Sequence, residues 1–365
     1  MASRILDCHV HLRDLSGIQD LEEIRRRVGA DRMNIVCVFG RENVNANPAA
    51  FVAKAEYPDR FYVFGGLDHS AHFSSGKIAA PSLAEQVDRL IALGADGIKM
   101  LENKPTHRKL LDIPVDGPYF EEYFARLEET GFPVLWHVCD PEEFWDPERT
   151  PGWAKERGWG YDDTFAPKEQ LYAEVENVLE RHPRLRIFFA HFYFLSADLR
   201  RAASLLDRFE NVHLDLAPGI ELLYNMSKDP SAVRDFFVRY SDRILFGTDI
   251  SSDQPVEEAR IRAGIVTRWL ETEDEYRVPE GADFLLGPPE DGVMRGLRLP
   301  EDTLAKIYRL NFERLAGSKP RPLNRELAAE ECERLAREIT ALKGLDPEHA
   351  DTSAADRLTD SGWGS

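Results

Sequence analysis

Histidine and aspartate residues close several apolar runs of this sequence, and residues of these types suit metal chemistry. His9 and His11 form an H-x-H pattern at the end of the first run, and His137, His191 and Asp249 each end a later run. Side chains alternate along a strand, so His9 and His11 should point the same way. Neutral imidazoles and a carboxylate together suit zinc or a similar borderline ion. The pattern therefore predicts a divalent metal site, provided that the fold brings these strand ends together.

The elements that must position these residues alternate along the chain. Short runs rich in Val, Ile, Leu and Phe, which are typical of buried parallel strands, are each followed by a segment with helical periodicity. The predicted strands cover residues 4–11, 33–40, 60–68, 96–101, 132–139, 185–192, 211–217 and 243–250. The predicted helices cover residues 18–28, 48–57, 82–93, 119–130, 168–181, 197–209, 231–240 and 301–315. Eight such repeats predict an α/β fold of the (β/α)₈ TIM-barrel type, whose strand ends share one mouth. A doubly wound open sheet is the alternative fold.

A barrel of this type needs about 250 residues, and the rest of the 365-residue chain falls in three segments. Two are predicted long loops after strands five and eight, residues 140–167 and 251–300. The first loop is rich in tryptophan, and we expect these rings to pack the loop on itself rather than to line a substrate pocket. The third segment contains a predicted helix over residues 324–342 and a polar end that we expect to fray. We therefore divide the chain into a barrel domain, residues 1–316, and a C-terminal helix with a flexible tail, residues 317–365.

The combined pattern resembles the amidohydrolase superfamily, in its mononuclear branch of hydrolases and nonoxidative decarboxylases related to aminocarboxymuconate semialdehyde decarboxylase. The likeness is carried by Asp7-x-His9-x-His11, by His137 and His191, by the strand end Phe246-Gly247-Thr248-Asp249 and by the late segment 307–315. The resemblance implies that His9, His11, His137 and Asp249 bind one divalent metal ion, foremost Zn²⁺, with Mn²⁺ or Fe²⁺ as alternatives. It further implies that Asp249 and His191 are catalytic.

The same resemblance implies a mechanism. The ion would lower the pKa of a bound water, and Asp249 would accept the proton of that water. The resulting hydroxide would attack the carbonyl of a small amide, lactone or ester, while the ion or His191 would stabilise the oxyanion. A metal-dependent nonoxidative decarboxylase of a small carboxylic acid is the alternative function, and a metal-binding barrel without catalysis is the third hypothesis.

Four further residues are predicted to contact the substrate: Arg13, Lys99, Trp136 and His69. Lys99 ends the fourth strand, where binuclear relatives carry a carboxylated lysine, so a second ion is expected if Lys99 is carboxylated. Its alternatives are an ammonium that binds a substrate carboxylate and a structural ion pair. Arg13 resembles the carboxylate-binding arginine of dihydroorotases, and the competing interpretation is a surface ion pair. If Arg13 and Lys99 both face the mouth, the substrate carries a carboxylate.

The composition limits the classes of partner. The chain has 46 Lys and Arg against 65 Asp and Glu, a net charge of −19. An acidic surface disfavours nucleic acid and anionic membranes, so we expect a small-molecule substrate. No apolar run is long enough for a membrane span, no secretory signal pattern is present, and four distant cysteines look like reduced core thiols, which together predict a cytoplasmic protein. A homodimer would be unsurprising for the superfamily that the chain resembles.

Overall fold

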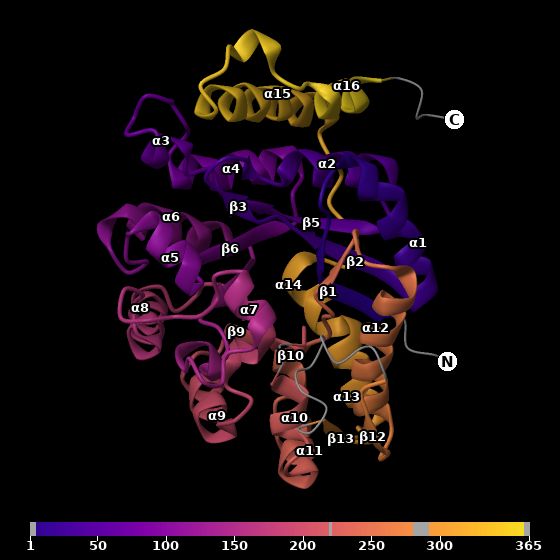
Figure 1. Ribbon diagram of the computed structural model, residues 1–365. Helices are drawn as coiled ribbons and strands as arrows, with labels where there is room; N and C mark the ends of the chain where they lie inside the picture. The colour runs from indigo at the N-terminus through magenta and orange to yellow at the C-terminus, as the bar shows by residue number, and fades with distance from the viewer. Residues whose placement is uncertain (1–4, 219–220, 280–291, 361–365) are drawn as a thin grey trace.

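Parallel strands form the centre of the molecule, and helices surround them (Figure 1). The computed structural model describes residues 5–218, 221–279 and 292–360. The strands of the central sheet are β1 (Ile5–His11), β2 (Ala30–Val36), β5 (Phe61–Gly66), β6 (Gly97–Asn103), β7 (Val134–Val138), β8 (Ile187–Phe189), β9 (Val212–Asp215), β10 (Ile244–Leu245) and β11 (Ile250–Ser251). Their order in the sheet is β10-β9-β8-β7-β6-β5-β2-β1-β11, and every pair is parallel.

The two ends of this sheet belong to one stretch of chain. β10 pairs with β9, β11 pairs with β1, and residues 246–249 connect the two short strands. The amide of Cys8 donates to the carbonyl of Phe246 at 3.0 Å, and the amide of Asp249 donates to the carbonyl of His9 at 2.9 Å. Residues 244–251 therefore act as the eighth strand and join β9 to β1. This closure confirms the predicted (β/α)₈ barrel, although the predicted strand over 243–250 is interrupted at its centre.

Helices follow the strands and cover the outside of the sheet. The long ones are α1 (Ile18–Val28), α2 (Asn47–Glu56), α4 (Leu83–Leu93), α6 (Pro118–Thr130), α8 (Lys168–Arg181), α9 (Leu199–Arg208), α11 (Pro230–Arg239) and α12 (Val256–Glu271). The eighth predicted helix is the run α13 (Glu301–Ala305), a π-helical turn (Lys306–Leu310) and α14 (Asn311–Ala316). Local chemistry sets their ends: Ser82 and Glu85 form a capping box at the start of α4, and Gly94 ends that helix in the left-handed region.

Two apolar layers stabilise the barrel. The larger lies between the sheet and the helices. The smaller lies inside the barrel and contains Leu6, Phe64 and Phe188 together with Phe312 of α14. Phe312 packs edge-on against Phe188 at a ring-centroid distance of 6.1 Å. Because the inner cluster holds residues from the early parts of several strands, it fills the amino-terminal end of the barrel and leaves the carboxyl ends free for polar side chains.

The two predicted long loops carry elements of their own. The first contains a short 3₁₀ turn (Glu142–Trp145) and α7 (Gly152–Glu156). The second contains α12 and the antiparallel pair β12 (Glu275–Arg277) and β13 (Val293–Arg295), while its residues 280–291 lie outside the described part of the chain. Other short strands and α-helices are β3 (Phe39–Gly40), β4 (Val44–Asn45), α3 (Ser70–Phe73), α5 (Pro105–Leu111) and α10 (Leu222–Met226).

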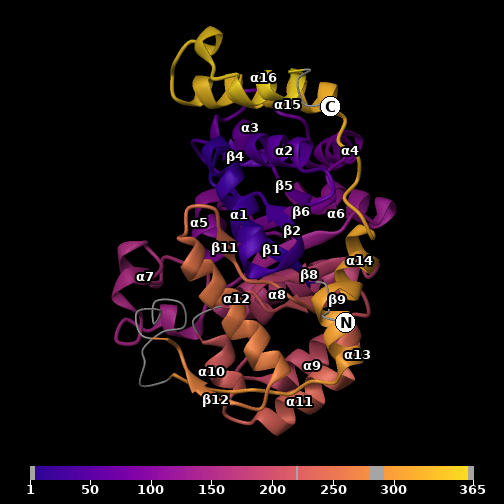
Figure 2. The ribbon, with the colours of Figure 1, turned by 90° about the vertical axis from the view of Figure 1, so that its right-hand side faces the viewer.

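The C-terminal segment forms a separate layer on the outside of the barrel. Helices α15 (Arg325–Leu342) and α16 (Ser353–Thr359) lie over α2 and α4, as both views show (Figures 1 and 2). Arg334 of α15 bonds to Asp68 at 2.8 Å. α16 lies within the segment that was expected to fray, and its apolar side chains Ala354, Ala355 and Leu358 are buried.

The structure also bears on the cysteines and on membrane-spanning helices. All four cysteines are buried and none forms a disulfide. Within residues 5–218, 221–279 and 292–360, no helix is both long enough and apolar enough to cross a bilayer.

Candidate metal centre and substrate cavity

The carboxyl ends of the strands open into a cavity of about 650 Å³. Its walls include His11 of β1, His137 of β7, His191 after β8 and Asp249 between β10 and β11. The fold therefore brings together the strand ends that the sequence singled out. Arg13 also lines the cavity, whereas Lys99, Trp136 and His69 do not appear among its lining residues.

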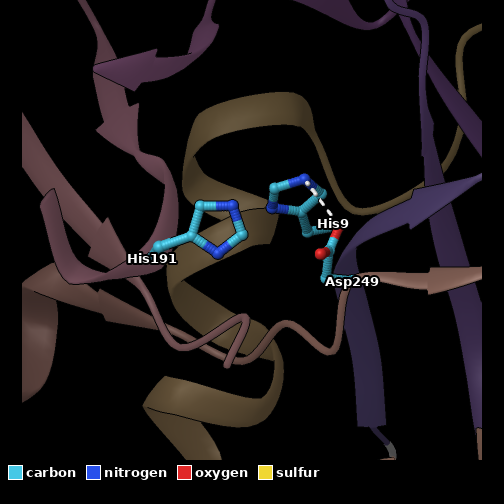
Figure 3. A group of neighbouring side chains, drawn as sticks. All are labelled: His9, His191 and Asp249. Carbon is cyan, nitrogen blue, oxygen red and sulfur yellow. Dashed lines mark ion pairs between the residues drawn. The ribbon is translucent and has the colours of Figure 1, made fainter. Parts of the chain in front are cut away.

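Three side chains form the tightest group of potential ligands. The nearest ligand atoms of His9, His191 and Asp249 all lie within 4.8 Å of one another. The three side chains point toward a common centre, with His191 approaching from the opposite side of the barrel mouth to His9 and Asp249 (Figure 3). Such a set, two imidazoles and a carboxylate, matches the ligand chemistry of zinc and of other first-row divalent ions.

Unusual backbone conformations aim two of these side chains. His191 has φ 55° and is followed by three more residues with positive φ, and Asp249 has φ 57°. Left-handed conformations are uncommon outside glycine, and they cost about 1–2 kcal/mol for each residue. Hydrogen bonds hold the first of them in place, because the amide of His191 donates to Asp215 Oδ1 at 2.7 Å. Such conformations cluster at functional sites.

Hydrogen bonds also fix the orientation of the two imidazoles. His9 Nδ1 donates to Asp215 Oδ2 at 2.8 Å, and His191 Nδ1 donates to the carbonyl of Ala217 at 3.0 Å. Both partners are acceptors only, so Nδ1 carries the proton and Nε2 presents a lone pair in each ring. This second layer of contacts is the usual support of a metal-binding imidazole.

The electrostatics of the group also fit a cation. Burial lowers the pKa of His9 well below 6.5, with Lys99 as the next contribution, so this imidazole is neutral. Burial alone would raise the pKa of Asp249, but the hydrogen bond from His11 and the nearby imidazoles lower it well below 3.8. A neutral imidazole and an ionised carboxylate are the states that a metal ion requires.

The other two predicted ligands border the group without joining it. His11 Nε2 lies 3.1 Å from Asp249 Oδ1. His137 lies with its ring centroid 4.9 Å from that of His191, but its Nε2 contacts Asp140 Oδ1 at 3.1 Å and the carbonyl of Cys139 at 3.0 Å. In this structure the Nε2 atom of His137 is therefore already occupied.

Asp140 is the centre of a buried network beside His137. Lys104 Nζ bonds to both of its carboxylate oxygens at 2.6 Å, and the Tyr161 hydroxyl donates to the same group. Burial would raise the pKa of Asp140, but Lys104 and the bond from His137 lower it below its ordinary range. Because Lys104 also lies over the Trp159 ring at 4.6 Å, this network anchors the tryptophan-rich loop to the barrel.

The two predicted carboxylate-binding cations are differently placed. Lys99 is buried beneath the cavity with Nζ 3.3 Å from His9 Nε2, and burial lowers its pKa to about 8. Arg13 reaches the rim of the cavity, where its side chain is 65% exposed and pairs with Asp253 at 3.1 Å. This pair matches the competing interpretation of Arg13 as part of a surface ion pair.

Two predicted substrate contacts lie elsewhere. Trp136 is fully buried on the helix side of the sheet, where its ring packs against Phe124 at a centroid distance of 5.5 Å. Strand alternation explains this position, because Trp136 precedes His137 and must point to the opposite face. His69 is buried against Glu102, with His69 Nε2 3.0 Å from Glu102 Oε1. Neither side chain is among the residues that line the cavity, and their contact with substrate stays a prediction.

The tryptophan-rich loop has both of the roles considered for it. Phe144, Ala154 and Tyr161 form a small core against which Trp145, Trp153 and Trp159 pack. Trp153 and Trp159 also line the cavity. The loop thus packs on itself and presents two aromatic rings to a ligand.

Three residues of the site were missed in the sequence. Asp215 ends the seventh strand at the position where other strands carry His137, His191 and Asp249, so the same strand-end rule could have found it. Lys104 directly follows β6, which extends to Asn103 and so runs past the predicted strand end at residue 101. Arg262 follows no such rule, because its place on the cavity wall depends on α12, which packs there through contacts that the sequence pattern does not reveal.

Comparison with known proteins agrees with this architecture. The sequence matches the family model described as amidohydrolase over residues 6–317. No protein with a curated description matches it. The fold is similar to that of an uncharacterised TIM-barrel protein from Bordetella bronchiseptica, with a TM-score of 0.52, 16% identity, and coverage of 86% of this chain and 99% of that chain.

Two further solved structures are similar in fold. A 2,6-dihydroxybenzoate decarboxylase from Rhizobium aligns with a TM-score of 0.51 and 15% identity, covering 86% of this chain and 98% of that chain. A probable 2-pyrone-4,6-dicarboxylic acid hydrolase from Acinetobacter baumannii aligns with a TM-score of 0.52 and 15% identity, covering 86% and 99%. At these identities the likeness concerns the fold alone.

Proposed function

Because the chain belongs to the amidohydrolase family, we propose that it is a metal-dependent hydrolase of a small amide, lactone or ester that carries a carboxylate. The observation that carries this proposal is the Asp249 carboxylate. It lies beside His9, His11 and His191, with its Oδ1 atom 3.6 Å from His9 Nε2 and 3.1 Å from His11 Nε2. An ionised carboxylate in a cavity of barrel strand ends is suited to accept a proton from an attacking water.

The residues that would hold the ion are Asp249 and the Nε2 atoms of His9 and His191. Lys99 Nζ, which lies 3.3 Å from His9 Nε2 in this structure, would have to give up that contact. We propose one divalent ion, foremost Zn²⁺, with Mn²⁺ or Fe²⁺ as alternatives and a second ion only if Lys99 is carboxylated. When bound, the ion supplies a Lewis acid that lowers the pKa of water toward neutrality. His11 and His137 complete the proposed ligand set.

The chain's own residues then handle the proton and the orientation of the site. A carboxylate oxygen of Asp249 accepts the proton of the attacking water and returns it to the leaving group. His191 donates through Nδ1 to Ala217, so its Nε2 has no proton to offer to an oxyanion. We therefore assign His191 to the support of the ion rather than to hydrogen bonding of the developing negative charge.

Nonoxidative decarboxylation is the second candidate function, since one of the similar folds is a 2,6-dihydroxybenzoate decarboxylase. That reaction ends with protonation of a carbanion and requires an acid at the site.

An isotope experiment separates these two functions. The metal-loaded protein is incubated in H₂¹⁸O with 2-pyrone-4,6-dicarboxylate and with 2,6-dihydroxybenzoate as probes. Hydrolysis places one ¹⁸O atom in the product carboxylate without loss of carbon, whereas decarboxylation releases CO₂ and leaves the organic product unlabelled. Chelation should abolish turnover, and Zn²⁺ should restore it.

The matched variant is Asp249→Asn, which keeps the shape of the side chain and removes its charge. We expect turnover to fall by about 10³-fold while the melting temperature changes little. A purely structural metal site would lose stability first. Turnover that survives both chelation and Asp249→Asn would contradict the proposed function.

A further inference from the structure

Arg262 presents an unpaired guanidinium to the cavity. It lies in α12, the helix that follows the closing strand, and it lines the cavity together with Asp249. Its Nε atom is shielded from solvent and has no hydrogen-bond partner among the described residues. Its Nη1 atom makes only a long contact, 3.4 Å, with the carbonyl of Thr248. Most of the donors of this side chain are therefore free for a ligand.

Other arginines of the same helix show that pairing is the rule there. Arg260 bonds to Glu257 at 3.0 Å, and Arg268 bonds to Asp274 at 3.0 Å. Within the described residues, no carboxylate lies within 4 Å of the Arg262 guanidinium. Burial lowers the pKa of Arg262, although nearby acids, Asp249 first, oppose this effect. A guanidinium remains charged in proteins, and a shielded charge without a partner is costly.

The other cations of the cavity wall are already engaged or solvated. Lys104 is held by Asp140, and Arg13 is held by Asp253 at the exposed rim. Arg157 is exposed and lies over the rings of Trp153 and Trp159, 5.3 Å and 5.5 Å from their centroids. Lys99 faces His9 below the cavity. Arg262 thus combines a place in the cavity, a shielded nitrogen and the absence of an acidic partner.

We propose that Arg262, and not Arg13 or Lys99, binds the carboxylate of the substrate and so determines its specificity. This inference rests on the proposed function. The planar fork of a guanidinium donates two parallel hydrogen bonds to a carboxylate. Trp153 and Trp159 supply flat apolar surface in the same cavity, so the ligand class that fits is a planar, aromatic carboxylic acid.

The proposal has a consequence for the reaction. A carboxylate paired with a cation is stabilised in the ground state, which opposes its loss as CO₂. The group bound by Arg262 is therefore an anchor that survives turnover. The bond that breaks belongs to another part of the same molecule, near Asp249.

Equilibrium binding of two isosteric probes tests the anchor without any turnover. Benzoate and benzamide are titrated into the metal-loaded protein by calorimetry, for the native protein and for Arg262→Gln, Arg262→Lys and Arg260→Gln. The native protein should prefer benzoate. Arg262→Gln should weaken benzoate binding by about 10- to 100-fold and leave benzamide binding unchanged. Arg262→Lys should be intermediate, because it keeps the charge and loses the fork.

Arg260→Gln is the matched control, since it changes an arginine of the same helix that lies outside the cavity, and its binding should equal that of the native protein. Arg13→Ala should retain the preference for benzoate. The proposal is wrong if the native protein shows no preference, or if Arg262→Gln keeps it. It is also wrong if Arg262→Gln alters only the pH profile of turnover, because that result would show an action through Asp249.

The same measurements separate the anchor from the proposed function. If Asp249→Asn abolishes turnover and Arg262→Gln leaves benzoate binding intact, the hydrolase stands and the anchor fails. If Arg262→Gln removes the preference for benzoate and no isotope label enters any product, the anchor stands and the hydrolase fails.

Discussion

The orientation of the proposed metal ligands depends on hydrogen bonds with residues behind them. Asp215 accepts hydrogen bonds from the ring of His9 and from the backbone of His191. Burial raises the pKa of Asp215 to about 6, so it is mostly ionised at neutral pH. One carboxylate thus fixes the ring of one ligand and the unusual backbone of another. It is a positioning residue, because it lies behind the group rather than in the cavity.

Replacing Asp215 with Asn should weaken metal binding about 10- to 100-fold, because the imidazole loses the acceptor that fixes its orientation. Competition with a metal-sensitive chelator measures this change. Glu102→Gln is the control, since Glu102 makes a comparable buried pair with His69 outside the cavity. Equal metal affinity in the native protein and in Asp215→Asn would contradict the role given to Asp215.

At the scale of elements, the outer layer formed by α15 and α16 shows how a polar sequence becomes ordered. α16 is only seven residues long, too short to be stable alone. Its Ala354, Ala355 and Leu358 are buried, and Arg357 pairs with Glu56 of α2. The helix therefore forms because a surface far away in the sequence receives it.

Two leucines of this layer give a matched test. Leu358 is 2% exposed, whereas Leu345 is 61% exposed in the turn between the helices. Leu358→Ala should lower the free energy of unfolding by about 2 kcal/mol or more through lost burial and a cavity. Leu345→Ala should change it by less than about 0.5 kcal/mol. Urea unfolding measures both values, and equal effects would mean that α16 does not contribute to stability.

The sequence predicted some elements closely and missed others for physical reasons. The predicted ranges 18–28 and 168–181 coincide with α1 and α8, whose amphipathic pattern matches burial on one side. The predicted strand over 185–192 ends early, because residues 191–194 adopt left-handed conformations that no propensity indicates. α16 was missed because its apolar positions are few and gain their energy from long-range contacts.

At the scale of the whole molecule, the free energy of unfolding at acidic pH depends on histidines that stay neutral in the folded protein. Burial lowers the pKa of His213 to about 3, with Arg243 as the next contribution. Between that value and about 6.5, the unfolded chain binds a proton at this position and the folded chain does not. Stability is therefore complete above pH 6.5 and falls as the pH drops toward 3, by up to about 1.4 kcal/mol per pH unit for this residue.

Replacing His213 with Asn should flatten the decline in the free energy of unfolding between pH 6.5 and 4. Denaturant unfolding at several pH values measures the slope. His349→Asn is the control, because His349 is exposed, and its slope should match that of the native protein. An unchanged slope in His213→Asn would show that His213 titrates alike in the folded and unfolded chains.

The closing strand also sets the order in which the active centre can come into existence. His9 and His11 are synthesised early, whereas Asp249 belongs to residues 244–251, which pair with both β9 and β1. Before that stretch is synthesised, the two histidines lack the Asp249 carboxylate and the barrel is open between β9 and β1. Any later local opening of residues 244–251 would also move Asp249 away from His9 and His11. Slow amide exchange at Cys8 and Asp249 is thus a direct gauge of how long the centre stays assembled.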